Sequence, residues 1–482
     1  MKNESHDARR PWNGSGANGR TIMSYIFYDT ETTGKVTAFD QILQFAAIKT
    51  DAELNVLDTF DVRCRLLPYI VPSPGALLVT GTTVADITTC PLSHFEMMRQ
   101  VHAKMHRWSQ GGSVFVGWNS MKFDETLVRQ AYYQSLLPVY QTNTIGNGRA
   151  DMMRMAQVVF ACAPNVLAVP VTAEGKRAFK LGLMAAANNV GLNNAHDALA
   201  DTNATLGIAK LIRQRAPALW DALMANARKS GPLRLLRSEP FMLLSEHFGN
   251  PFNSIVTPLA ANASNANEVA LFDLQFDPAP YLGAVDADLR EAIDGTTKVI
   301  RRVSINAQPG LLPVDHAPDE VQGGRQSLET YQARVQAIRE HPEFCRRISR
   351  LLAARYADQA ESAFVEQRIY SGFPSNADQT RMHAFHSQGW EDRVGIIREI
   401  EDERYRQIAQ RIVAIERPDL LTDAQRQRWE SWRRERVLTD EKVPWMTVAS
   451  AIEELADESQ DATPAQRAQL ADLERFLDGL CR

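Results

Sequence analysis

The chain has 482 residues, of which 44% are apolar and 23% are charged, and its formal net charge is −5. A chain of this length exceeds one ordinary hydrophobic core, so two or three domains are expected, and the composition is that of a soluble globular protein. No stretch approaches the roughly 18 consecutive apolar residues that a helical membrane span requires, which excludes such a span.

The N-terminal segment and the cysteines bear on the cellular compartment. Residues 1–22 are polar, rich in Gly, Asn and Arg, and contain no apolar core, so they are interpreted as a disordered leader and not as a secretory signal. The five cysteines are scattered and form no C-x-x-C pair. Together these features predict reduced thiols, a cytoplasmic protein and no zinc site.

The first two hundred residues predict an α/β (α+β) domain with a mixed sheet. Strand-like runs occur at 25–28, 42–49, 56–66 and 113–119, and helical patterns at 91–108, 123–137, 151–162, 180–189 and 195–213. Prolines and a glycine between 68 and 75 predict an irregular segment. Strands followed by helices that alternate with one more strand are typical of this fold class.

Two regions of different character follow. Short apolar runs separated by turn-rich stretches predict a small β-rich barrel or sheet domain, and they lie at 241–244, 254–257, 269–273 and 298–300. Beyond residue 326 the pattern is helical to the end and rich in Arg, Glu, Gln and Ala. A third, helical domain is therefore expected.

The stretch 25–34 carries the first candidate site. Its apolar run predicts a buried strand, and Asp29 and Glu31, two residues apart, project from the same face of that strand. Two such carboxylates repel each other and lose solvation, so they stay ionised only beside a cation. Hard oxygen ligands suit Mg²⁺ or Mn²⁺. A solvated strand end is the alternative interpretation of so short a motif.

Three further residues could complete this site, although each has a simpler interpretation alone. Asp124 falls in the first turn of a predicted helix, where an acidic side chain also favours the helix dipole. His196 and Asp201 are five residues apart. On an ideal α-helix their side chains would be separated by about 140° around the axis, so they would not share a helix face. The spacing predicts that His196 lies at the helix start and that Asp201 reaches the same site from the next turn. A capping histidine and a solvated aspartate are the alternatives.

In combination these five residues resemble the DEDDh exonucleases, a ribonuclease-H-like superfamily of 3′→5′ exonucleases. The matching segments are D-x-E-T-x-G with Asp29 and Glu31, N-x-x-x-F-D with Asp124, and A-H-D-A-x-x-D with His196 and Asp201. The resemblance implies that the four carboxylates hold two Mg²⁺ ions, for which Mn²⁺ can substitute. It also implies that His196 acts as the general base, so that all five residues are catalytic.

Three further segments of the first domain and one in the last third of the chain are similar to the bacterial exodeoxyribonuclease I family. They lie at 44–51, 74–81, 193–198 and 370–378. That family has an exonuclease domain, an SH3-like β-barrel domain and a C-terminal helical domain, which together form a groove for single-stranded DNA. The first motif, D-T-E-T-T-G, departs from this family and is closer to the superfamily consensus. The expected divisions are a leader at 1–22, an exonuclease domain at 23–216, an SH3-like domain at 217–356 and a helical domain at 357–482.

The resemblance implies an enzyme that degrades single-stranded DNA 3′→5′ to 5′-mononucleotides, in DNA repair and recombination. Side chains close to the motifs are the expected substrate contacts, namely Thr32, Thr33, Phe123 and Arg149. We expect a monomer whose partners are single-stranded DNA and the acidic C-terminal tail of single-stranded-DNA-binding protein.

Two alternatives remain open at this point. A 3′→5′ exoribonuclease or oligonucleotidase would share the catalytic core, because nothing in the motif recognises a 2′-hydroxyl. A non-catalytic single-stranded nucleic-acid-binding scaffold would keep the fold, but it predicts the loss of a carboxylate or of His196, and all five residues are present.

Overall fold

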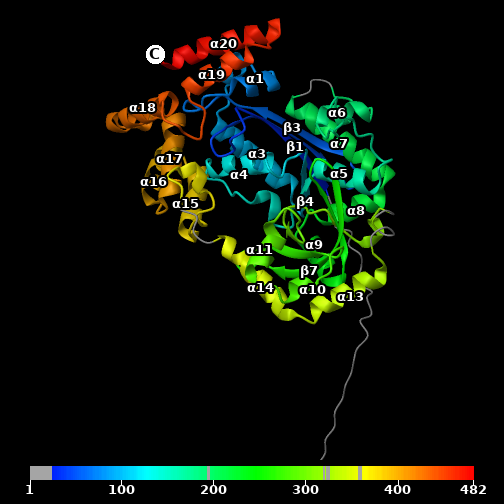
Figure 1. Cartoon of the computed structure of the whole chain (residues 1–482). Coiled ribbons are helices and arrows are strands. Elements are labelled where there is room, and N and C mark those ends of the chain that lie inside the picture. The colour runs from blue at the N-terminus through cyan, green and yellow to red at the C-terminus, as the bar shows by residue number, and fades with distance from the viewer. Residues whose placement is uncertain (1–23, 193–195, 319–320, 322–325, 357–360, 482) are drawn as a thin grey trace, which may run out of the picture.

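A five-stranded mixed sheet forms the centre of the N-terminal half of the chain (Figure 1). The computed structural model describes residues 24–192, 196–318, 321, 326–356 and 361–481, so the predicted leader lies outside the described residues. The strands are β1 (Ser24–Thr32), β2 (Ile42–Thr50), β3 (Val56–Arg63), β4 (Ser113–Gly117) and β5 (Gly148–Asp151). Their order is β3-β2-β1-β4-β5, with antiparallel pairing among β1, β2 and β3 and parallel pairing of β4 with β1 and β5.

Helices cover both faces of this sheet. They are α1 (Pro74–Thr80), α2 (Val84–Thr89), α3 (His94–Trp108), α4 (Asp124–Tyr133), α5 (Met152–Cys162), α6 (Leu181–Ala187), α7 (Ala198–Arg215) and α8 (Pro217–Ala225). Of these, α3 and α4 pack on one face, and α5, α7 and α8 pack on the other. The start of α7 predicted at residue 195 lies outside the described residues.

The alternation of side chains along β1 divides them between two apolar cores. Tyr25 and Phe27 belong to the core beneath α5, α7 and α8. Ile26 and Tyr28 belong to the core beneath α3 and α4. Since successive side chains point to opposite faces, any odd-numbered residue further along β1 faces α7 and any even-numbered residue faces α4.

A second sheet of five antiparallel strands follows. Its strands are β6 (Met242–His247), β7 (Pro251–Ala261), β8 (Glu268–Asp273), β9 (Ile300–Ser304) and β10 (Leu311–Leu312), in the order β10-β6-β7-β8-β9. Its helices are α9 (Ser230–Ser238), α10 (Ala279–Leu282), α11 (Asp286–Asp294), α13 (Leu328–Arg339) and α14 (Pro342–Ala353). The short antiparallel strands fit the predicted SH3-like domain. One continuous apolar cluster joins the two sheets, and the boundary at residue 217 stays a prediction.

The C-terminal region is helical. It consists of α15 (Asn376–Ser387), α16 (Trp390–Glu399), α17 (Glu403–Glu416), α18 (Asp423–Leu438), α19 (Val448–Glu458) and α20 (Pro464–Cys481). Its helices pack against the first domain at two places: α15 to α17 meet Phe95 of α3 and Tyr133 of α4, and α19 and α20 meet Leu77 of α1 (Figure 1). Within the part of the chain that the structure describes, no helix is both long enough and apolar enough to cross a membrane.

The structure confirms the mixed α/β fold with a helical C-terminal region and differs from the prediction in two short elements. Helix α1 begins at Pro74, inside the segment at 68–75 predicted to be irregular. Pro74 occupies its first turn, where a missing N–H breaks no helical bond, and the Ser73 side chain caps it. Strand β5 has no sequence signal, because its Gly-Arg-Ala-Asp sequence lacks an apolar run.

A buried ion cluster joins the helical region to the first domain. Glu366 is 1% exposed, and its Oε1 lies 2.7 Å from Arg411 Nη1 and 3.0 Å from Arg436 Nη2. Arg436 lies over the rings of Trp445 of the helical region and Phe39 of the first domain. Burial raises the pKa of Glu366, but the two guanidinium groups outweigh it and hold that pKa below its usual value.

We expect Glu366→Gln to destabilise the protein by about 3–5 kcal/mol, because it leaves the buried Arg436 and the partly buried Arg411 guanidinium groups without their counter-charge. Chemical denaturation measures this loss. Glu343→Gln is the control, because the Glu343–Arg346 pair is exposed and should contribute less than about 1 kcal/mol. Equal losses in the two variants would contradict a stabilising role for the buried cluster.

Candidate active site

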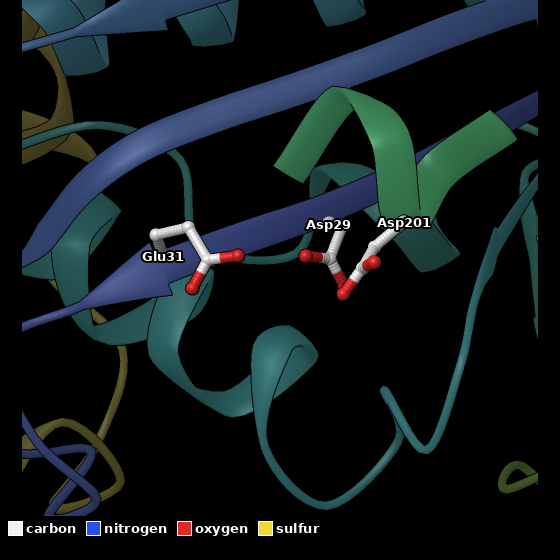
Figure 2. A group of neighbouring side chains, drawn as sticks. All are labelled: Asp29, Glu31 and Asp201. Atoms are coloured by element: carbon white, nitrogen blue, oxygen red, sulfur yellow. The ribbon is translucent and has the colours of Figure 1, made fainter. Parts of the chain in front are cut away.

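Three carboxylates converge where the end of β1 meets the start of α7. Asp29 and Glu31 project from the face of β1 that α7 covers, and Asp201 lies in the first turn of α7. Each residue offers an oxygen, and these three atoms lie within 4.8 Å of one another. Figure 2 shows the carboxylates of Asp29 and Asp201 side by side, with Glu31 further along the same strand. The strand and helix thus bring together three of the four predicted metal-holding residues.

The electrostatics of this group are unfavourable without a cation. Burial raises the pKa of Asp29 well above its usual range, and the negative charges of Asp124, Glu31 and Asp201 raise it further. Burial and the neighbouring carboxylates, Asp201 first, raise the pKa of Glu31 to about 8. Burial also raises the pKa of Asp201, against the opposing effect of His196. Burial therefore opposes the ionisation of each of these carboxylates, and neighbouring negative charges add to the effect at Asp29 and Glu31.

The donor atoms fit a hard divalent cation. Asp201 Oδ1 is buried and has no hydrogen-bond partner among the described residues. Arg63 lowers the pKa of Glu31, but its guanidinium lies 2.7 Å from the carboxylate of Asp197. A cation bound by three converging carboxylate oxygens would both satisfy the unpaired oxygen and offset the repulsion.

His196 lies at the start of α7, as its spacing from Asp201 predicts. It is exposed, directly precedes the N-cap residue Asp197, and has a φ of 68°. A positive φ is uncommon for a residue other than glycine and marks sites where the surroundings impose a conformation. Asp197 caps α7 through Leu199 N–H and also accepts a 3.1 Å hydrogen bond from Gln44 of β2. The helix start is thereby fixed to the sheet.

Asp124 reaches the site from the opposite face of β1. It is 5% exposed and begins α4, and its Oδ1 accepts a 2.5 Å hydrogen bond from Thr30 Oγ1. Burial raises the pKa of Asp124 to about 7, against the opposing hydrogen bond from Thr30. Asp124 lies outside the group of three, yet among the charges that raise the pKa of Asp29 it comes first. It is therefore a neighbour of Asp29.

Several residues that support the site carry no signal in the sequence motifs. Thr30 contacts Asp124, and Gln44 and Asp197 hold the start of α7. Asp151 of β5 accepts the Asn119 N–H at 3.0 Å in the loop before α4. Of these residues, Thr30 has a position in the sequence that points to the site, because it lies between the motif carboxylates Asp29 and Glu31.

The side chains expected to contact substrate differ in their burial and in their internal partners. The Thr32 hydroxyl bonds the carbonyl of Gly34, and the fully buried Thr33 bonds Asp40. Phe123 is half-buried beside the core under α4.

The arrangement around Arg149 does not support the expected phosphate contact. Its guanidinium is buried, lies 3.0 Å from Glu125, and donates to the Asn306 carbonyl. Thr33 and Arg149 are structural in this arrangement, because internal partners occupy the groups that were expected to meet substrate.

A cleft of about 410 Å³ opens between the loop after β4 and the second sheet. Its lining includes basic and amide side chains, among them Asn119, Lys122, Arg154, His247, Arg302 and Gln308. Asn119 and Lys122 belong to the loop that leads into Asp124, and a cleft with basic side chains can accept a phosphodiester chain.

Comparisons with known proteins find similarity to exonucleases along most of the chain. The family described as Exonuclease matches residues 26–209, and the family described as Exonuclease I C-terminal domain matches residues 363–480. The curated exodeoxyribonuclease I of Escherichia coli (strain K12) is 28% identical over 437 residues, which cover 86% of this chain and 90% of that protein.

Solved structures give the same result. Escherichia coli exonuclease I in complex with a dT13 oligonucleotide has a TM-score of 0.81 at 25% identity, covering 95% of this chain and 100% of that chain. A structure of SSB and exonuclease I in complex with an inhibitor has a TM-score of 0.80 at 25% identity, with the same coverage. The structural similarity thus extends over all three parts of the fold.

The raised pKa of Glu31 predicts how stability depends on pH and metal. Between its usual pKa of 4.5 and the folded value of about 8, the metal-free folded protein keeps a proton that the unfolded chain releases. The stability contributed by this group is therefore complete below pH 4.5 and is lost as the pH rises through about 8. We expect Glu31→Gln to stabilise the EDTA-treated protein at pH 8 by about 2 kcal/mol and to flatten its melting-temperature profile.

Mg²⁺ should raise the melting temperature of the wild-type protein more at pH 8 than at pH 5.5, since protons and the cation compete for the same oxygens. Glu53→Gln, an exposed change on the β2–β3 turn, is the matched control and should leave the profile unchanged. A pH profile of Glu31→Gln identical to the wild type would contradict the raised pKa.

Proposed function

Because the chain belongs to the exodeoxyribonuclease I family, we propose that it hydrolyses single-stranded DNA from the 3′ end and releases 5′-mononucleotides. The observation that carries this proposal is the group of Asp29, Glu31 and Asp201, whose carboxylate oxygens lie within 4.8 Å of one another. That group stands in a fold similar to exonuclease I over 95% of this chain. A scaffold without catalysis would have no need to keep three mutually repelling carboxylates together.

We propose that the divalent cation is Mg²⁺, with two ions bound and with Mn²⁺ able to substitute. When bound, such ions lower the pKa of a coordinated water and stabilise negative charge on the phosphate and on the leaving oxygen. Asp29, Glu31 and Asp201 would hold one ion, and Asp124 together with Asp29 would hold the other. The raised pKa values of these carboxylates support this assignment, since cations relieve the repulsion.

His196 is proposed as the general base. It is exposed at the start of α7, next to Asp201, so its imidazole is accessible to a water molecule on the open side of the site. The ordinary pKa of histidine lies near neutral pH, which suits transfer of a proton from the attacking water. The side chain can then release that proton to solvent.

The remaining parts of the chain would bind and hold the DNA. Lys122, Arg154 and Arg302 line the cleft between the loop after β4 and the second sheet, and they are proposed to contact phosphates. The acidic C-terminal tail of single-stranded-DNA-binding protein is a proposed partner, supported by the similarity to a structure that contains SSB and exonuclease I. We further propose a monomer that acts in the cytoplasm, in DNA repair and recombination.

The direct test uses 5′-labelled single-stranded DNA, the matching RNA and a duplex, each with Mg²⁺ and with EDTA. We expect a metal-dependent ladder that shortens from the 3′ end on single-stranded DNA. Asp29→Asn should reduce cleavage to background, whereas Asp58→Asn, the same change at an exposed position of β3, should retain activity. Faster loss of RNA would indicate an exoribonuclease, and no cleavage with binding retained would indicate a scaffold.

The role of His196 has its own test. We expect His196→Gln to lower kcat by about 10²–10⁴-fold, because the general base is lost, while Mn²⁺ binding measured by calorimetry stays near the wild-type level. Asp29→Asn should lose both activity and metal binding. His106→Gln on α3 is the control and should leave the rate unchanged. A His196→Gln enzyme with wild-type kcat would exclude the proposed role.

A further inference from the structure

A loop of the second sheet is bonded to β5, the edge strand of the first sheet. The loop runs through 306–308, between β9 and β10. The carbonyl oxygen of Asn306 accepts a hydrogen bond from Arg149 Nη2 at 2.7 Å, and Gln308 Oε1 accepts one from the Asp151 N–H at 2.5 Å. Arg149, Asp151 and Gln308 are all buried, and Gln308 has a φ of 47°. Both residues that the loop holds belong to β5.

Asp151 in turn fixes the backbone that leads into Asp124. Its Oδ1 accepts the Asn119 N–H at 3.0 Å, and its Oδ2 accepts the Met121 N–H at 3.3 Å. Asn119 has a φ of 57°, a conformation that needs such outside support. The segment from 119 to 121 joins β4 to the first residue of α4. The carboxylate of Asp151 therefore sets the direction from which Asp124 enters the site.

Arg149 fixes the residue on the other side of Asp124. Its Nη1 lies 3.0 Å from Glu125 Oε1, and the same oxygen accepts the Thr142 hydroxyl at 2.5 Å and pairs with Arg129 at 2.7 Å. Glu125 is 2% exposed. The other oxygen of Glu125 accepts the Tyr28 hydroxyl at 3.2 Å. A buried carboxylate with four partners has little freedom to move, so the first turn of α4 is held in place.

We propose that the second sheet positions the Asp124 carboxylate through the loop 306–308, with Asp151 and Arg149 as positioning residues. The inference rests on the proposed function, because it takes Asp124 to hold a divalent cation. Thr30 orients one oxygen of Asp124, and the backbone on both sides of Asp124 depends on β5 and the loop. In this proposal the second sheet positions a carboxylate of the metal site, in addition to its proposed contribution to DNA binding.

Two variants break the connection between the loop 306–308 and Asp124, one at Asp151 and the other at Arg149. Gln308→Asn withdraws the amide oxygen from Asp151 by one methylene while tolerating the left-handed backbone. Arg149→Met removes the contacts with Glu125 and Asn306. We expect each to weaken Mn²⁺ binding to the DNA-free protein, measured by calorimetry, and to raise the Mg²⁺ concentration for half-maximal rate, both by about 10-fold. In Arg149→Met, a change outside the cleft lining, affinity for single-stranded DNA in EDTA should change by less than about 2-fold, and Arg149→Lys should recover part of the lost metal binding.

Asn226→Ala is the matched control. Its side chain donates to the carbonyls of Pro309 and Leu311, so the change loosens the same segment of the second sheet without altering Arg149 or Asp151. We expect a lower melting temperature with unchanged Mn²⁺ binding. The positive control is Asp124→Asn, which should weaken Mn²⁺ binding directly.

Wild-type metal binding in both Gln308→Asn and Arg149→Met would overturn the proposal, and so would an equal loss in Asn226→Ala. Unchanged Mn²⁺ binding in Asp124→Asn would also overturn it. If the wild-type protein binds Mn²⁺ but cleaves no DNA, the proposed function fails while calorimetry still decides whether the loop positions Asp124.

Discussion

Repulsion among buried carboxylates is the constraint on which the rest of the site depends. One carboxylate oxygen from each of Asp29, Glu31 and Asp201 lies within 4.8 Å of the other two. Burial raises all three pKa values, and neighbouring carboxylates raise those of Asp29 and Glu31 further. Folding gains nothing from such a group unless a ligand compensates it, because each ionised carboxylate is costly in a desolvated site. The apolar cores on both sides of β1 supply the stability that holds the strand end in this unfavourable state.

The two-residue period of β1 explains how the carboxylates are divided. Odd positions face α7, which places Asp29 and Glu31 beside Asp201. Even positions face α4, where Thr30 bonds Asp124. Asp124 therefore approaches from the other side of the strand, and this placement supports the proposal of a second ion held by Asp124 together with Asp29. Because β4 runs parallel to β1, the end of β4 and the following loop to Asp124 lie at the same edge of the sheet as the end of β1.

The placement of Asp29 and Glu31 on one face of a strand, that of Asp201 in the first turn of a helix, and most elements of the first domain could be predicted from the sequence, because alternation, helix starts and spacing are local properties. The contacts that hold the motif in place could not be predicted. Arg149 next to Asp151 suggested a phosphate contact, but the strand β5 buries both, and partners 157 residues away in the chain, Asn306 and Gln308, bind them. That arrangement is visible only in the folded structure, where the loop 306–308 of the second sheet contacts strand β5 of the first sheet.

The central claim is that Asp29, Glu31 and Asp201 bind a divalent cation, and anomalous diffraction from crystals grown with Mn²⁺ tests it most directly. The account predicts an anomalous peak bonded to oxygens of all three carboxylates, and its disappearance in Asp29→Asn crystals grown under the same conditions. A map with Mn²⁺ bound elsewhere and none among these carboxylates would contradict the account.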